Sequence, residues 1–218
     1  MVKKYGKNAP PTEVLVILDK SGSMWPIQDD VIGSMNAFFS KQKKLAGKCR
    51  VTLLTFDSEG QTIYESKDIR TVPELTPESY QPKGSTALLD AIGNGMLELE
   101  TRIRSMETKP QVLVSILTDG MENASKEFTL DQVNALIDKV KKADWEIVFL
   151  AAGIDAIASA QVFRVGNTLG IPFSACGTVC SSSAGMRIMG DAFSIHLANF
   201  RSGSKSNFNE VLVSVKQH

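Results

Sequence analysis

Histidine and cysteine are scarce in this chain, with 2 and 3 copies among 218 residues. Three cysteines do not complete a set of disulfides, and a chain of this length folds without one. Cys176 and Cys180 form the one closely spaced pair, but neither a second pair nor a nearby histidine accompanies them, which argues against zinc. His196 and His218 are the only histidines that a serine nucleophile could use as a base, and both come late in the chain. The sequence therefore gives little support to zinc binding or to Ser-His catalysis.

The chain also lacks an excess of charge and a long apolar run. Lysine plus arginine number 24, and aspartate plus glutamate number 24. Nucleic acids and acidic membranes attract concentrated positive charge, so neither is an expected partner. The longest apolar runs, such as residues 14–18, are far too short to span a bilayer, and no apolar segment follows the N-terminal lysines as in a signal peptide. We therefore expect a cytoplasmic protein with no membrane partner.

Apolar strands alternate with amphipathic helices along most of the chain. Strands are predicted at residues 14–18, 49–56, 62–66, 112–117 and 146–151, with a short one at 173–176. Helices are predicted at residues 27–47, 88–106, 129–140, 155–169 and 186–200. Strands that are apolar on both faces indicate a parallel sheet covered by helices. The prediction is a doubly wound, Rossmann-like α/β fold with a mostly parallel six-stranded sheet and one antiparallel edge strand, at residues 62–66.

The sequence shows no internal repeat and no linker, so one domain is expected over residues 13–201. A short lead, residues 1–12, precedes it. The tail, residues 202–218, begins with a polar, glycine- and serine-rich stretch and ends with apolar residues at 211–215. We expect this tail to add an edge strand or to act as an arm that docks a partner.

Polar side chains follow several of the predicted strands. Asp19, Ser21 and Ser23 come directly after the first strand. Thr86 precedes the second long helix, and Asp119 follows the strand at 112–117. In doubly wound folds, ligands bind at the carboxyl ends of the strands, so these side chains are expected to share one edge. Hydroxyl and carboxylate oxygens without histidine or thiolate favour Mg²⁺, Mn²⁺ or Ca²⁺.

This pattern resembles the metal-ion-dependent adhesion site of the von Willebrand factor type A (VWA) domains, also called integrin I-like domains. The resemblance is carried by Asp19-x-Ser21-x-Ser23, by Thr86 in Gly-Ser-Thr-Ala-Leu-Leu-Asp-Ala-Ile, and by Asp119 in Leu-Thr-Asp-Gly. It covers roughly residues 12–200 and is strongest toward compact, stand-alone bacterial and phage members. The resemblance implies that Ser21, Ser23 and Thr86 bind Mg²⁺, or Mn²⁺ or Ca²⁺, directly, while Asp19 and Asp119 act through coordinated water.

The function implied by the resemblance is metal-dependent protein binding rather than catalysis. Neutral hydroxyl ligands leave the charge of the cation poorly compensated, so an Asp or Glu of a partner protein gains a strong bond to it. Similar domains serve beside AAA+ ATPases or in stress-response complexes, which makes these the expected kinds of partner. A second hypothesis is a metal-dependent hydrolase or phosphotransfer protein that uses Asp19 or Asp119. A third is a structural subunit that binds partners outside the metal site, through residues 202–218.

Known nucleotide and phosphotransfer motifs are missing. No P-loop and no G-x-G-x-x-G follows any predicted strand, and Ser21 stands where haloacid-dehalogenase-type phosphotransferases need a second acid. Three further acidic residues, Asp57, Glu122 and Asp155, lie just past predicted strand ends. Each is expected either at the rim of the site or in a solvated loop. Trp25 is expected to pack against the first helix, with an exposed contact as the alternative.

Overall fold

The sheet is mixed, and β1 lies inside it between β2 and β4. The computed structural model describes residues 10–151, 167–169, 183–204 and 206–216. The strand order is β3-β2-β1-β4-β5-β6, and only the β2–β3 pair is antiparallel. The strands are β1 (Thr12–Asp19), β2 (Cys49–Phe56), β3 (Gly60–Asp68), β4 (Gln111–Thr118), β5 (Glu146–Ala151) and β6 (Asn167–Leu169). This arrangement is an α/β fold compatible with the predicted Rossmann-like architecture, and the antiparallel strand lies at the edge as expected.

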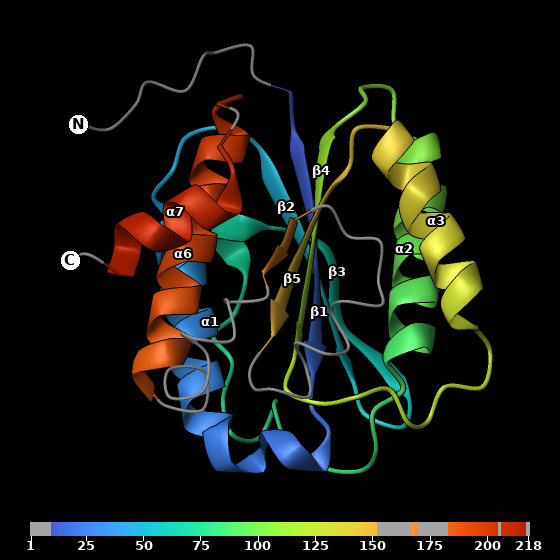
Figure 1. The fold of residues 1–218 in the computed structure, drawn as a ribbon. Coiled ribbons are helices and arrows are strands. Elements are labelled where there is room, and N and C mark those ends of the chain that lie inside the picture. The colour runs from blue at the N-terminus through green and yellow to red at the C-terminus, as the bar shows by residue number, and fades with distance from the viewer. Residues whose placement is uncertain (1–9, 152–166, 170–182, 205, 217–218) are drawn as a thin grey trace.

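Helices cover both faces of the sheet (Figure 1). One face carries α1 (Gln28–Lys43), α6 (Ser183–Arg201) and α7 (Phe208–Lys216), and the other carries α2 (Leu88–Arg104) and α3 (Leu130–Lys142). Two short 3₁₀ helices complete the described elements, η1 (Gly22–Ile27) and η2 (Ile69–Thr71). The rings of Phe38 in α1 and Phe193 in α6 stack with centroids 4.6 Å apart. On the other face, α2 approaches the sheet closely at Gly95, where an added Cβ would lie 3.4 Å from the side chains of Leu15 and Leu54.

The position of β1 determines where a ligand can bind. All eight residues of β1 are buried, as expected for a strand covered on both faces. The chain leaves β1 through α1 toward β2, whereas it leaves β4 through α3 toward β5 on the other side. The strand order therefore reverses between β1 and β4, and in doubly wound folds ligands bind at the carboxyl ends of the strands at such a point. In Figure 1 the carboxyl end of β1 and the following η1 lie at the lower edge of the sheet.

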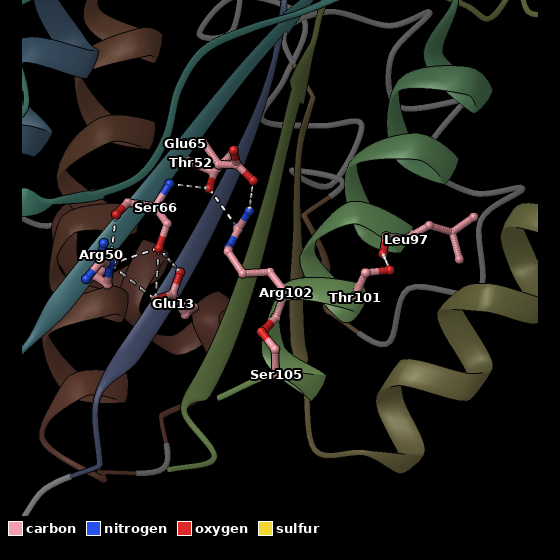
Figure 2. A network of polar contacts seen from close by, with 9 residues as sticks. All are labelled: Glu13, Arg50, Thr52, Glu65, Ser66, Leu97, Thr101, Arg102 and Ser105. Atoms are coloured by element: carbon pink, nitrogen blue, oxygen red, sulfur yellow. Dashed lines mark hydrogen bonds and ion pairs between the residues drawn. The ribbon is translucent and has the colours of Figure 1, made fainter. Parts of the chain in front are cut away.

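A polar network joins β3, the edge strand, to the centre of the sheet (Figure 2). Glu13 of β1 is 2% exposed, and the Ser66 hydroxyl lies 3.3 and 3.2 Å from its two carboxylate oxygens. Arg102 of α2 donates to Thr52 at 2.9 Å and to Glu65 at 2.5 Å. Burial raises the pKa of Glu13, and the nearby Arg102 and Ser66 only partly oppose this. The network thus links β3 and α2 to the sheet near the amino end of β1.

Two predictions about the C-terminal part were wrong. Residues 167–169 form strand β6, parallel to β5, and do not continue a helix. Residues 211–215 belong to helix α7 and do not form an edge strand. Phe208, Val211 and Leu212 have helical spacing and are at most 7% exposed, so one face of α7 is buried. The β-branched residues of this segment favoured a strand locally, but the burial of one helical face outweighs that preference.

Several predicted features lie outside the described residues. These are Asp155, the helix predicted from it up to residue 166, the strand at 173–176 and the thiols of Cys176 and Cys180. Within the described ranges, no helix combines the length and the apolar character needed to cross a bilayer.

Candidate functional site

Asp19, the last residue of β1, lies at the carboxyl end of the strand, where the strand order reverses. It is 0% exposed. Its Oδ1 accepts a hydrogen bond from the Ser21 backbone N–H at 2.7 Å, and its Oδ2 accepts one from the Thr118 hydroxyl at 2.5 Å. The Tyr80 hydroxyl donates to the Asp19 carbonyl oxygen at 2.6 Å. These contacts fix the carboxylate in one position between the two strand ends.

The Asp19 carboxylate is held in a medium that disfavours its charge. Burial raises its pKa from 3.8 to about 6, although hydrogen bonds from Thr118 and Ser21 favour the ionised form. The negative charge of Asp119 adds a smaller upward contribution. Burial and the charge of Asp119 thus both disfavour ionised Asp19, and a positive charge placed beside it would favour the ionised form.

Ser21, Ser23 and Asp119 form a chain of neighbouring oxygens beside Asp19. The hydroxyls of Ser21 and Ser23 lie 3.1 Å apart, and the Ser23 hydroxyl donates to Asp119 Oδ1 at 2.7 Å. Ser21 is buried, Ser23 is exposed and Asp119 is half-buried, so these oxygens extend from the interior to the surface. The loops after β1 and β4 therefore meet at this edge, as the sequence predicted.

Thr86 reaches the same place from the loop before α2. An added Cβ at Gly120 would lie 3.5 Å from the Thr86 hydroxyl and 3.6 Å from that of Ser23, so both hydroxyls flank the turn after Asp119. Asn123 holds Thr86 by two hydrogen bonds. Its Oδ1 accepts from the Thr86 N–H at 2.8 Å, and its N–H donates to the Thr86 carbonyl at 3.1 Å. The structure thus brings all five residues of the predicted site together.

Asp57, one of the three expected rim residues, is committed to an internal ion pair. Its Oδ2 lies 2.9 Å from the Lys20 ammonium, and both side chains are nearly buried. Burial raises the pKa of Asp57, but the hydrogen bonds from Lys20 and the Glu59 N–H outweigh it, so that the pKa falls below its ordinary value. This pair ties the loop after β1 to the loop after β2.

Glu122, the second expected rim residue, clamps the loop after β4 onto α2. Its carboxylate accepts from the N–H groups of Leu89, Ala124 and Ser125 and from the Ser125 hydroxyl, at 2.7–2.9 Å. Asp90 of α2 reciprocates by accepting from three backbone N–H groups at 126–128. The two carboxylates hold residues 122–128 in one conformation against the start of α2. The third expected rim residue, Asp155, lies outside the described residues.

Sequence reasoning missed three residues that position the site. Thr118 orients Asp19, Tyr80 holds the end of β1, and Asn123 holds Thr86. Thr118 has a local signal, since it ends an apolar strand next to Asp119. Tyr80 and Asn123 have none, because each acts on a residue far away in the chain.

The donor set fits a hard divalent cation. It consists of three hydroxyls and two carboxylates, with no imidazole or thiolate among them, and oxygen donors of this kind suit Mg²⁺, Mn²⁺ or Ca²⁺. Across the part of the chain that the structure describes, no group of three or more His, Cys, Asp or Glu residues is arranged to hold a metal ion. Any cation at this site would therefore depend on serine and threonine hydroxyls.

The prediction that Trp25 packs against the first helix was wrong. Trp25 is 63% exposed, whereas its neighbour Met24 is fully buried. The side chain of Met24 thus anchors η1 to the core, and Trp25 faces solvent beside the site.

Comparison with known proteins gives structural neighbours only. No protein-family model matches the chain, and no curated protein does. The PilB minor pilin from Streptococcus sanguinis is similar over 89% of this chain and 63% of its own, with a TM-score of 0.63 and 12% identity. The manganese-loaded TRAP protein from Plasmodium vivax is similar over 71% and 63%, with a TM-score of 0.51 and 19% identity.

A domain named as vWF is also among the similar structures. It belongs to the type V pili tip protein Mfa5 from Porphyromonas gingivalis and matches 52% of this chain and 39% of its own, with a TM-score of 0.39 and 18% identity. The chain spans less than two thirds of each of these three proteins. At such low identities the likeness concerns the fold.

Proposed function

We propose that this chain is a VWA-type module that binds a partner protein through a divalent cation, Mg²⁺ or alternatively Mn²⁺ or Ca²⁺. The observation that carries the proposal is the oxygen cluster at the strand reversal. The Ser23 hydroxyl lies within hydrogen-bond distance of both the Ser21 hydroxyl and Asp119, which comes from a distant loop, and the Thr86 hydroxyl lies near that of Ser23. Beside Ser21 lies the buried Asp19 carboxylate, whose charge is disfavoured by its burial.

The residues of the site have distinct roles in this proposal. The Ser21, Ser23 and Thr86 hydroxyls hold the cation directly, and Asp19 and Asp119 hold its waters. When bound, the cation supplies an electrophilic position that a partner's Asp or Glu carboxylate occupies. Thr118 keeps Asp19 oriented, which stops the carboxylate from rotating away.

The partner is a protein that presents an exposed Asp or Glu, within an AAA+ ATPase assembly or a stress-response complex in the cytoplasm. The name of the S. sanguinis neighbour, a minor pilin, raises a location on a pilus as the alternative. The Mn²⁺ in the name of the TRAP neighbour supports a divalent cation on this fold.

The first test is the thermal stability of the purified protein in Mg²⁺ and in EDTA. Binding to the folded state alone raises stability by about 2.7 kcal/mol when the cation is at 100 times its Kd. Thr86→Ala should lose most of this gain. Thr101→Ala is the matched control, because its hydroxyl bonds to Leu97 within α2 and is exposed on the helix surface. A wild-type melting temperature that ignores millimolar Mg²⁺ and Mn²⁺ contradicts the proposal.

The second test is capture of partners from host lysate by tagged protein in Mg²⁺, in EDTA and with Thr86→Ala. Partners retained in all three conditions would place the interface away from the site. The hydrolase hypothesis is checked on the same material with generic phosphoesters. Turnover that disappears in EDTA and with Asp19→Ala would replace binding by catalysis as the function.

A further inference from the structure

Two large apolar side chains stand exposed in the segments that follow β1 and β4, which carry the site. Trp25 is 63% exposed and Met121 is 55% exposed. The other large apolar side chains exposed among the described residues lie in helices: Leu97 in α2, Ile195 in α6 and Val213 in α7. Single exposed residues on helices are common and need no explanation. Trp25, in η1, and Met121, in the loop after β4, instead lie in the two segments that carry the polar site.

Chain connectivity places the backbone of both residues near the same point. Trp25 is two residues beyond Ser23, and Met121 is two residues beyond Asp119. Two residues of extended chain span about 7 Å at most. Because the Ser23 hydroxyl donates to Asp119 at 2.7 Å, the two apolar residues border one cluster of oxygens from two loops. We call Trp25 and Met121 the apolar rim.

Both members of the apolar rim are carried on fixed backbone. Trp25 lies in η1, with Met24 buried before it and Pro26 after it, and its carbonyl accepts a hydrogen bond from the Gln28 N–H. Met121 lies between Gly120, whose N–H donates to Thr118, and Glu122, which clamps the loop to α2. Side chains held on rigid backbone lose less entropy on binding. Exposed tryptophan on such a support is characteristic of interface hot spots.

We infer that the site recognises a carboxylate with an aromatic or aliphatic side chain close to it in a protein segment, and that the apolar rim binds that side chain. The inference rests on the proposed function, because the cation it requires selects an anionic group. The inference adds a second determinant of ligand specificity to the carboxylate. The carboxylate provides metal dependence, while Trp25 and Met121 select which acidic segment binds and contribute affinity through buried apolar area.

The test uses a random peptide library displayed on phage. Selections are run on wild-type protein in Mg²⁺, on wild-type protein in EDTA, and in Mg²⁺ on the double variant Trp25→Ser/Met121→Ser. Leu97→Ser/Val213→Ser is the control, since it removes two exposed apolar side chains, 40% and 56% exposed, from helices α2 and α7. The rise in melting temperature with Mg²⁺ checks the fold and metal binding of every variant.

The expected result in Mg²⁺ is enrichment of peptides with Asp or Glu near an aromatic or aliphatic residue, and its loss in EDTA. The best peptide should bind the rim double variant at least about tenfold more weakly and the control variant equally well, as truncation of hot-spot residues costs more than 1 kcal/mol each. Acidic peptides without apolar preference, or equal binding by the rim variant, would overturn this inference and leave the proposed function intact. Absence of any metal-dependent acidic peptide would instead refute the proposed function, and the inference with it.

Fluorescence gives an independent readout, because the chain has 2 tryptophans. Trp145 is 7% exposed and precedes the start of β5, at the opposite end of the strands from the site. In a Trp145→Phe variant, Trp25 is the single reporter, and saturating peptide should shift its emission to shorter wavelength. Unchanged emission would overturn the inference. Self-association in sedimentation experiments that Trp25→Ser abolishes would assign the apolar rim to a second copy of the chain and would overturn it too.

Discussion

Asp19→Asn should make the metal-free protein more stable, although it alters the most buried acid of the site. The Asp19 carboxyl group has a pKa of about 6 in the folded chain, compared with an ordinary value of 3.8. At about 1.4 kcal/mol per pKa unit, that difference corresponds to a cost of about 3 kcal/mol at pH 7.5, where both states are ionised. Asparagine removes the charge and keeps the shape.

The hydrogen bonds of the site survive this substitution. The amide oxygen of the new side chain accepts from the Ser21 N–H, and its NH₂ donates to the Thr118 hydroxyl. The proton of Thr118 can then turn to the Gly120 carbonyl, 3.5 Å away. The gain in stability therefore reflects the removed charge.

The pH dependence gives the sign of the effect. Because the folded pKa of Asp19 is the higher one, the folded state binds its proton more tightly, and the contribution of Asp19 to stability falls as pH rises from about 4 to 6. In EDTA, the free energy of unfolding measured in urea should be higher for the asparagine variant than for wild type, by about 3 kcal/mol at pH 7.5 and about 1 kcal/mol at pH 4.5. Glu13 also has a raised pKa, but it is present in both proteins and cancels in the difference.

Mg²⁺ should reverse the order of stability, so that wild type is more stable than the asparagine variant. A cation beside Asp19 removes the cost of its charge, so wild type gains stability in Mg²⁺ and the asparagine variant gains little. An asparagine variant that is less stable than wild type in EDTA at pH 7.5 would refute the reasoning. So would a difference that stays the same between pH 7.5 and 4.5.

Two further substitutions test how the site and its support are built. Asn123→Ala should lower the free energy of unfolding in urea by about 1 kcal/mol and weaken the stabilisation by Mg²⁺, since the Thr86 N–H loses its acceptor. Asn123→Asp is the control, because it keeps the acceptor and should keep the stability. An alanine variant with a wild-type response to Mg²⁺ would show that Thr86 is held by other contacts. Gly93→Ala should cost about 1–3 kcal/mol because its Cβ would lie 2.6 Å from the Phe128 ring. Gly33→Ala in α1 should instead raise the free energy of unfolding by about 0.5–1 kcal/mol, because nothing lies within 4 Å of the added Cβ. Equal effects at the two glycines would contradict the packing described.

The α/β class and the main strands could be predicted from the sequence because their signals are local. The apolar runs at β1 and β4, the latter interrupted only by Ser115, indicate burial on both faces, and Thr129 with Gln132 forms the capping box that begins α3. The C-terminal segment shows where such signals fail. Val211 and its β-branched neighbours favour a strand, yet contact with α6 makes the segment a helix.

The sequence by itself determined which oxygens are available: Asp19, Ser21, Ser23, Thr86 and Asp119 stand at element ends, where parallel strands place side chains at one edge. Only the tertiary structure decided their surroundings. It buried Asp19 under Thr118, 99 residues away, paired Asp57 with Lys20, and left Trp25 in solvent. The physical reason is that strand and helix preferences act over a few neighbouring residues. Burial, hydrogen bonding and pKa depend instead on which distant segments the closed sheet brings into contact.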